Sequence, residues 1–364
     1  MPSLPAPDLV VEDVRKIAVL RAGGLGDFIF TLAALGALRE TYPEAEITLL
    51  GGPLQTGLLE GRPEPAQHAI TVPPSTGVNG PDTGVEEDEE ALQSFFARMK
   101  EERFDLALQM HGGGGYSNPF VSKLQARVTA GTRTPDAPPL DRTVPYVYHQ
   151  LEILRHLEVA SLVGARTTDL EPRLPVTDVD LAEAGSVVPN IYSPLVALHP
   201  GAGDPRRRWP PGKFAAVGDS LAEAGARVAI VGVEEDHALI SRIAAAMKHE
   251  AIDLCGRLSL AGLAGLLSRC AVVVSNDSGP LHLARAVGAA TVGIYWGPNL
   301  INAGPPTRAR HRPALSWRSN CPVCGATLFD NDCGHAVSVI ADIPIEEVAR
   351  YALELLAPAG QDAI

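Results

Sequence analysis

Short apolar segments alternate with helical segments along the whole chain, and most of the apolar segments end in glycine or polar residues. This alternation predicts parallel strands joined by right-handed helical crossovers, and therefore an α/β fold. The pattern begins twice within 364 residues, a length that fits two domains of roughly 100–200 residues. We expect domains at 14–188 and 189–345, followed by a C-terminal helix and tail at 346–364 that pack back on the first domain.

Apolar periodicity gives the expected elements of each half. In the first half it predicts strands at 15–22, 45–50, 68–72 and 104–110, and helices at 28–40, 91–102 and 146–158. In the second half it predicts strands at 195–198, 227–231, 271–275 and 291–295, and helices at 211–224, 236–248, 260–268, 280–287 and 346–356. The pattern weakens between residues 163 and 193, where prolines are frequent, and this places the domain boundary there.

Charge and hydropathy exclude several functional classes. The formal net charge is −13, so the basic footprint of a nucleic-acid-binding protein is absent. No segment reaches the roughly 18 consecutive apolar residues that suit a membrane-spanning helix. The N-terminus lacks the basic start and apolar stretch of a signal peptide. We therefore expect a cytoplasmic protein, with peripheral contact at the inner face of the cytoplasmic membrane at most.

In open α/β sheets, ligands bind beyond the carboxyl ends of the strands. In the second half these ends carry small or polar residues: His199, Gly201, Gly203, Glu234, Asn276, Asp277, Ser278 and Gly279, with His282 in the helix that follows. We expect Ser278 or Asp277 to cap that helix, whose free N–H groups and dipole suit a diphosphate. A capped helix that binds no ligand would have the same sequence.

Two further features of the second half suit a nucleoside diphosphate. Arg206–Arg208 follow the Gly201–Gly203 turn, and a guanidinium there could clamp a pyrophosphate and stabilise the charge of a departing diphosphate. Glu234 lies just past a strand end, where a carboxylate can bind ribose hydroxyls.

The first half carries a glycine-rich turn, Gly23–Asp27, that lacks the third glycine of a dinucleotide-binding loop. Asp27 lies where this turn becomes a helix, so it is either an N-cap or a general base that takes a proton from an attacking hydroxyl. His111 is followed by four glycines, and this loop is a candidate contact for an acceptor.

Four segments together resemble glycosyltransferase family 9, the ADP-heptose:lipopolysaccharide heptosyltransferases. They are Arg21–Asp27, His199–Pro210, Val231–Glu234, and Ser275–Leu283 followed by Tyr295–Pro298. The resemblance extends from Ile17 to the final helix. It implies a GT-B fold, with two Rossmann-like domains facing each other across a central cleft. It also implies inverting sugar transfer that requires no metal or other cofactor.

The resemblance assigns roles by position. Asp27 matches the proposed catalytic base, and Arg207 matches a donor-phosphate contact that is usually Lys. Glu234 matches the ribose-binding carboxylate. The family's phosphate-binding loop matches Asp277, Ser278, Gly279 and His282 of this chain. We expect additional donor contacts at Gly26, His199, Gly201, Gly203 and Asn276, and acceptor contacts at Gly24 and His111. Where many members have Thr or Ser, this chain has Gly201-Ala202-Gly203, so backbone N–H groups would replace side-chain contacts.

The implied reaction transfers a sugar, expected to be heptose from an ADP donor, to a glycan hydroxyl in lipopolysaccharide or other envelope glycan synthesis. Three alternatives remain: a sugar-nucleotide epimerase, a phosphorylase, and a binding protein that does not catalyse transfer. A nucleotide-dependent dehydrogenase is disfavoured because the dinucleotide loop is incomplete.

A cysteine cluster lies near the end of the chain. Cys321, Cys324, Cys333 and His335 are zinc-ligand types within fifteen residues, and C-x-x-C is a common metal clip. The short loop between the pairs argues against zinc. We therefore expect no metal requirement and keep zinc as the alternative.

Overall fold

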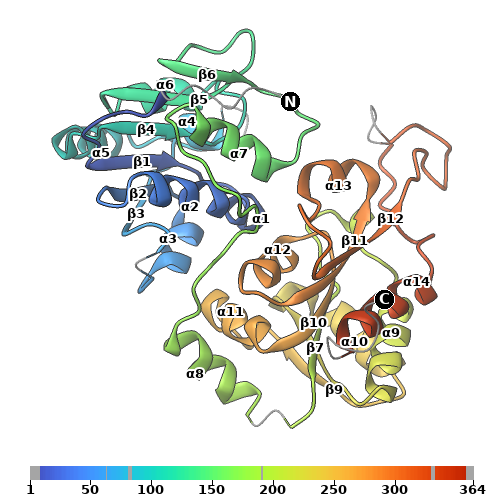
Figure 1. Ribbon diagram of the computed structural model, residues 1–364. Helices are drawn as coiled ribbons and strands as arrows, with labels where there is room; N and C mark the ends of the chain where they lie inside the picture. Colours follow the sequence, from blue (N-terminus) through green and yellow to red (C-terminus); the bar gives the residue numbers. More distant parts are fainter. Residues whose placement is uncertain (1–8, 63, 81–83, 190–191, 329–332, 358–364) are drawn as a thin grey trace. The chain divides into compact units, whose positions relative to one another are not determined.

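The computed structural model describes residues 9–62, 64–80, 84–189, 192–328 and 333–357 (Figure 1). The chain divides into two compact units, Met1–Pro175 and Val176–Ile364. Each unit contains one six-stranded sheet in which all paired strands are parallel. The predicted α/β class with two parallel sheets is confirmed.

The sheet of the first unit has the order β3-β2-β1-β4-β5-β6. Its strands are β1 (Lys16–Leu20), β2 (Glu46–Gly51), β3 (His68–Thr71), β4 (Leu106–Gln109), β5 (Val128–Arg133) and β6 (Arg142–Pro145). Its helices are α1 (Leu25–Ile29), α2 (Leu32–Thr41), α3 (Pro53–Leu59), α4 (Thr76–Asn79), α5 (Glu89–Glu102), α6 (Ser117–Ser122) and α7 (Glu152–Ser161). Helices cover both faces of the sheet, so β1 is almost wholly apolar and buried.

The second unit repeats this plan with the order β12-β11-β10-β7-β8-β9. Its strands are β7 (Leu195–His199), β8 (Arg227–Gly232), β9 (Ala251–Cys255), β10 (Cys270–Asn276), β11 (Ala290–Trp296) and β12 (His311–Ser316). Its helices are α8 (Asp178–Val187), α9 (Pro211–Glu223), α10 (His237–Ala246), α11 (Leu260–Ser268), α12 (Gly279–Ala286), α13 (Gly297–Ala303) and α14 (Ile345–Leu356), with short 3-10 turns η3 (Pro205–Arg207) and η4 (Glu234–Asp236).

The structure divides the chain after Pro175, earlier than the predicted boundary at residue 188. The reason is α8, which the sequence analysis missed: it packs against α11 and so belongs to the second unit. At the start of this helix the Thr177 hydroxyl oxygen accepts a hydrogen bond from the Asp180 N–H, and the Asp180 carboxylate accepts one from the Thr177 N–H. This reciprocal capping fixes the helix start without a strong apolar period.

The C-terminal helix α14 packs on α9, β10, β11 and β12 of its own unit. Its Val348 and Ala352 are buried in that unit's hydrophobic core. These contacts place the helix on the second unit, and the expected packing of the last segment on the first domain stays a prediction. The predicted helix at 146–158 also begins later, at Glu152, because residues 142–145 form the edge strand β6.

Candidate active site

Both sheets reverse their winding direction at one point, and the candidate site residues lie at these two points. In the first unit the reversal separates β1 from β4, and in the second it separates β7 from β10. Loops leaving the carboxyl ends of such neighbouring strands diverge to opposite faces and open a crevice for a ligand. Asp27 and His111 follow β1 and β4, whereas His199 is the last residue of β7 and Asp277 follows β10.

His199 ends β7 and joins it to the start of α12. Its Nδ1 lies 3.2 Å from Ser275 Oγ and 3.1 Å from Ser278 Oγ. Burial lowers the pKa of His199 to about 4, against an opposing effect of the nearby Asp236 carboxylate. The imidazole is therefore uncharged at neutral pH and acts as a fixed polar support.

The structure corrects the expected capping of α12. Ser278 is the N-cap residue, but its hydroxyl donates to the Asn276 carbonyl and its side chain makes no cap hydrogen bond. The Asp277 carboxylate contacts Arg207 and His282 instead. Because both side chains are used elsewhere, neither satisfies the first N–H groups of α12, and this helix start retains its capacity to bind an anion.

Asp277 is the centre of a buried charge network. Its Oδ2 lies 3.1 Å from Arg207 Nη1, and its Oδ1 lies 3.1 Å from His282 Nε2. The side chains of Asp277 and His282 are each only 4% exposed, whereas that of Arg207 is 28% exposed. The Asp277 carboxylate thus holds Arg207 in place while part of the guanidinium stays open to a ligand.

The neighbouring arginines have different partners. Arg206 pairs with Asp204 at 2.8 Å, and Arg208 donates two hydrogen bonds to the Ala202 carbonyl. Of the three arginines in the η3 loop, Arg207 is the one that the structure joins to the start of α12. This geometry singles out Arg207, as the sequence analysis did.

Asn276 fixes the loop that carries Arg207. Its Oδ1 accepts from the Trp209 N–H at 3.1 Å, and its Nδ2 donates to the Pro200 carbonyl at 2.7 Å. Asn276 is fully buried. Its amide thus ties the two ends of the 200–209 loop to β10, so we assign it a positioning role.

Replacing Asn276 with Ala should lower the free energy of unfolding by about 2–4 kcal/mol, because two buried backbone groups lose their partners. Urea unfolding followed by tryptophan fluorescence would measure the change. Asn299→Ala is the matched control, and its effect should stay below about 0.5 kcal/mol. Equal losses in the two variants would show that Asn276 does not hold the loop.

Glu234 begins η4 directly after β8, and its carboxylate is exposed. A Cβ on Gly256 would lie 2.6 Å from Glu234 Oε2, so the carboxylate sits directly over the glycine that follows β9. The exposed carboxylate at this strand end suits binding of hydroxyl groups.

Asp236 is a site residue that the sequence analysis missed. It is 7% exposed, and a Cβ on Gly201 would meet its Oδ2 at 2.6 Å and His199 Nε2 at 3.1 Å. Gly201 is thus needed for the close approach of these two side chains, while Gly203 has open space around its Cα. The run of acidic residues at 234–236 could have pointed to Asp236, but the sequence analysis named only Glu234 as a candidate.

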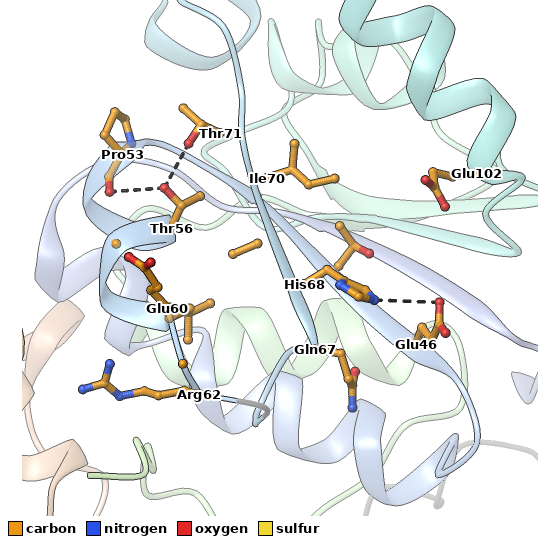
Figure 2. Close-up of a pocket in the computed structure, with 15 residues that line it drawn as sticks. Glu46, Pro53, Thr56, Glu60, Arg62, Gln67, His68, Ile70, Thr71 and Glu102 are labelled. Atoms are coloured by element: carbon orange, nitrogen blue, oxygen red, sulfur yellow. Dashed lines mark hydrogen bonds and ion pairs between the residues drawn. The ribbon is translucent and has the colours of Figure 1, made fainter. Parts of the chain in front are cut away.

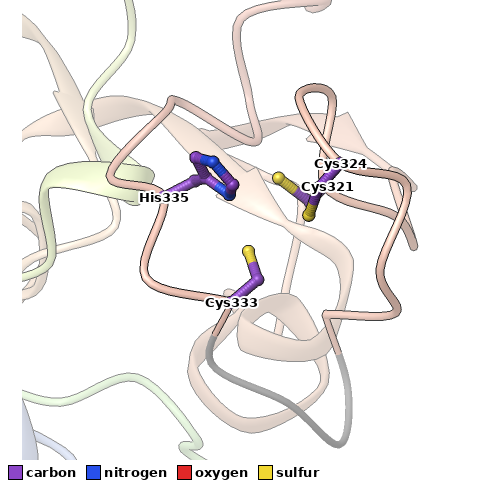
Figure 3. A group of neighbouring side chains, drawn as sticks. All are labelled: Cys321, Cys324, Cys333 and His335. Carbon is purple, nitrogen blue, oxygen red and sulfur yellow. The ribbon is translucent and has the colours of Figure 1, made fainter.

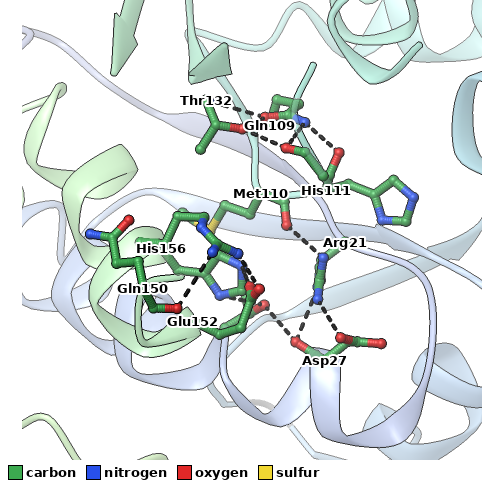
Figure 4. Close-up of polar contacts among 12 residues, drawn as sticks. Arg21, Asp27, Gln109, Met110, His111, Thr132, Gln150, Glu152 and His156 are labelled. Carbon is green, nitrogen blue, oxygen red and sulfur yellow. Dashed lines mark hydrogen bonds and ion pairs between the residues drawn. The ribbon is translucent and has the colours of Figure 1, made fainter. Parts of the chain in front are cut away.

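In the first unit, Asp27 is held by its own turn and by Arg21 (Figure 4). Its Oδ2 accepts from the Gly24 N–H at 3.0 Å, and its Oδ1 pairs with Arg21 Nη2 at 3.0 Å. Gly24 is the N-cap residue of α1, and Gly26 lies in the first turn. Asp27 is therefore not an N-cap but the third helical residue, and its side chain remains 49% exposed.

A cavity of about 250 Å³ opens beside Asp27, with His111 on its wall. His111 Nε2 donates to the Val78 carbonyl at 2.6 Å, and burial lowers the pKa of this histidine. The same cavity contains three residues of α7 that the sequence analysis missed: Glu152, Arg155 and His156. The spacing of these three residues was the sequence feature that could have revealed them, since residues three and four apart share a helix face.

A larger hollow of about 860 Å³ lies along the edge strand β3 and helix α3 (Figure 2). Its polar contacts include Thr56 with Thr71 and Glu46 with His68. None of the predicted site residues lines it. The smaller cavity beside Asp27 is therefore the candidate site of this unit.

The structure also brings the cysteine cluster together. The ligand atoms of Cys321, Cys324, Cys333 and His335 all lie within 4.8 Å of one another. Backbone N–H groups of Cys324 and Val323 lower the pKa of the Cys321 thiol to about 6. This group lies on the segment between β12 and α14.

Known proteins resemble this chain in both sequence and fold. The family model described as glycosyltransferase family 9 (heptosyltransferase) matches residues 92–321. The chain therefore belongs to glycosyltransferase family 9 and is a glycosyltransferase.

Individual relatives extend the match to most of the chain. Lipooligosaccharide heptosyltransferase 2 of Haemophilus ducreyi is 24% identical over 80% of this chain and 86% of its own length. A family 9 glycosyltransferase structure from Veillonella parvula matches with a TM-score of 0.78 at 21% identity, covering 95% of this chain and 99% of that one. The structure of E. coli ADP-heptose LPS heptosyltransferase II matches with a TM-score of 0.70 at 20% identity, covering 94% and 98%. The fold is thus GT-B.

Among the described residues, no helix combines the length and apolar character needed to cross a membrane.

Proposed function

We propose that the protein transfers heptose from ADP-heptose, with inversion, to a hydroxyl of a lipopolysaccharide-type glycan. The observation that carries the proposal is the Arg207–Asp277–His282 network beside the uncapped start of α12. A guanidinium and free helix N–H groups together suit the two phosphates of a nucleotide sugar. The E. coli relative, an ADP-heptose heptosyltransferase by name, supports the choice of donor.

The donor would lie across the carboxyl ends of β7, β8 and β10. Its diphosphate would contact Arg207 and the backbone of Ser278 and Gly279, and its ribose would contact Glu234. Asp277, His282 and Asn276 would hold these groups in place without touching the sugar. Such fixed donors need little reorganisation as charge develops on the departing phosphate.

In the chemical step, the acceptor oxygen forms a bond to the anomeric carbon as its proton passes to the Asp27 carboxylate. The bond between the anomeric carbon and the phosphate oxygen breaks, and ADP leaves from the opposite face with its charge held by Arg207. Arg21 orients Asp27 through the ion pair at Oδ1 and through a hydrogen bond from Nε to the Asp27 carbonyl. His111 and Gly24 would line the acceptor side.

A ligand screen tests the donor. ADP should raise the melting temperature more than GDP, UDP or CDP, because a ligand that binds only the folded state adds about 2.7 kcal/mol at 100 times its Kd. Differential scanning fluorimetry with each diphosphate would measure the shifts. A larger shift with another base would overturn the ADP assignment.

An activity assay separates transfer from the alternative functions. Incubation with ADP-heptose should release ADP at a rate that depends on added heptose-deficient lipopolysaccharide acceptor. An epimerase would change the donor without an acceptor, and a phosphorylase would require inorganic phosphate. A binding protein would shift in melting temperature and release no ADP.

A further inference from the structure

Cys321 and Cys324 lie on one tight turn that places both thiols on the same side. The Cys321 N–H donates to the Ala326 carbonyl at 2.8 Å, and the Gly325 N–H donates back to the Cys321 carbonyl at 2.9 Å. Gly325 has a φ of +75°, which favours glycine at this position. An isolated antiparallel bridge between Asn320 and Thr327 closes the turn.

Cys333 and His335 come from the returning chain and face this turn. Figure 3 shows the three sulfur atoms and the imidazole ring pointing toward a common centre. His335 Nδ1 is buried and makes no hydrogen bond within the described part of the chain. A polar nitrogen in that state costs free energy unless a ligand satisfies it.

The distances fit a single small cation. All four ligand atoms lie within 4.8 Å of one another. Around tetrahedral Zn²⁺, with Zn–S of about 2.3 Å and Zn–N of about 2.0–2.1 Å, ligand atoms lie about 3.6–3.8 Å apart. Shifts of about 1 Å or less would close the site. The short spacing that argued against zinc in the sequence is therefore no obstacle, because Cys333 and His335 lie beside the turn that carries Cys321 and Cys324.

We propose that Cys321, Cys324, Cys333 and His335 bind one structural Zn²⁺. Three thiolates and one imidazole form a closed Cys₃His set, in which the protein fills all four positions. Such a set leaves no position for substrate, so the ion would stabilise the fold and take no part in sugar transfer.

The ion would hold the 317–344 segment, whose described residues contain no helix or strand. This segment supports the Arg207 loop directly. The Val339 N–H donates to the Arg206 carbonyl at 2.8 Å, and Trp209 Nε1 donates to the Ile343 carbonyl at 3.2 Å. We infer that loss of the ion loosens this loop and weakens donor binding. This inference rests on the proposed donor site.

Metal analysis of the purified full-length protein tests the site. We expect inductively coupled plasma mass spectrometry to find about one zinc per chain. A mercurial reagent that titrates thiols should release this zinc. Cys324→Ser should lose most of this zinc, while Cys255→Ser, the matched control in the same unit, should retain it. Cys324 is exposed, so its replacement should leave the core intact. Circular dichroism of both variants would check this.

Replacement of zinc by Co²⁺ provides a second measurement. Co²⁺-loaded protein should show the ligand-field bands of tetrahedral thiolate coordination, and Cys324→Ser should lose them. Wild-type protein with neither stoichiometric zinc nor these bands would overturn the proposal. So would stoichiometric iron in place of zinc, or a disulfide among these cysteines found by mass spectrometry.

The two proposals fail separately. Zinc content is measured without nucleotide, so bound zinc together with no response to any nucleoside diphosphate would reject the donor site alone. Donor binding in a zinc-free protein would reject the metal site alone. Where both hold, we expect Cys324→Ser to weaken ADP binding by at least about five-fold and Cys255→Ser to change it less than two-fold.

Discussion

Asp27→Asn should lower kcat for sugar transfer by about 10²–10⁴-fold, the range that a positioned general base contributes. The amide has nearly the shape of the carboxylate but cannot take the acceptor proton. Its oxygen can still accept from the Gly24 N–H, so the first turn of α1 should persist. Donor affinity, measured by calorimetry with ADP, should change less than two-fold because the proposed donor residues lie in the other unit.

Two comparisons separate catalysis from a structural role. Glu40→Gln removes an exposed carboxylate from α2 in the same unit and should leave kcat within two-fold of wild type. The melting temperature of Asp27→Asn should stay within a few degrees of wild type. Full transfer activity in Asp27→Asn would contradict the assignment of Asp27 as the general base. The role of Asp27 would then be to order its turn.

The sequence predicted the strand ends that carry the candidate residues better than the contacts among those residues. Strand ends could be located because β1, β7 and β10 are buried on both faces and therefore read as continuous apolar runs. Once the strands are placed, the winding of each sheet brings the loops after β1 and β4, and after β7 and β10, to one crevice per unit.

The partners of these residues are tertiary, so no local pattern could give them. Asp277 and Arg207 are 70 residues apart, and Asn276 bonds to Trp209 across 67 residues. Asp236 contributes through its closeness to Gly201 and His199, which only the fold creates. The strands β6, β9 and β12 were missed because each is short or only partly buried, which weakens the apolar signal. The strand β5 was missed because its buried residues are threonine, alanine and glycine and form no strongly apolar run.

Arg207→Met should lower kcat/KM for the donor by about 10²–10³-fold, the loss measured when one preorganised charge-stabilising donor is removed from an active site. Methionine keeps much of the side-chain length but removes the charge and leaves Asp277 Oδ2 without its partner. Because the Asp277 carboxylate is buried, part of the loss in kcat/KM will come from leaving this charge without its partner. The double variant Arg207→Met with Asp277→Asn removes the buried charge and should regain stability while transfer stays low.

Two further replacements make the Arg207 prediction specific. Arg207→Lys keeps the charge but loses the planar fork, so it should retain at least about ten-fold more activity than Arg207→Met. Arg206→Met removes the same charge one residue earlier, where the side chain pairs with Asp204 and not with the start of α12. It should lower kcat/KM less than three-fold. Equal losses in Arg206→Met and Arg207→Met would mean that the loop acts through its total charge, and that the contact between Arg207 and Asp277 does not position a phosphate-binding group.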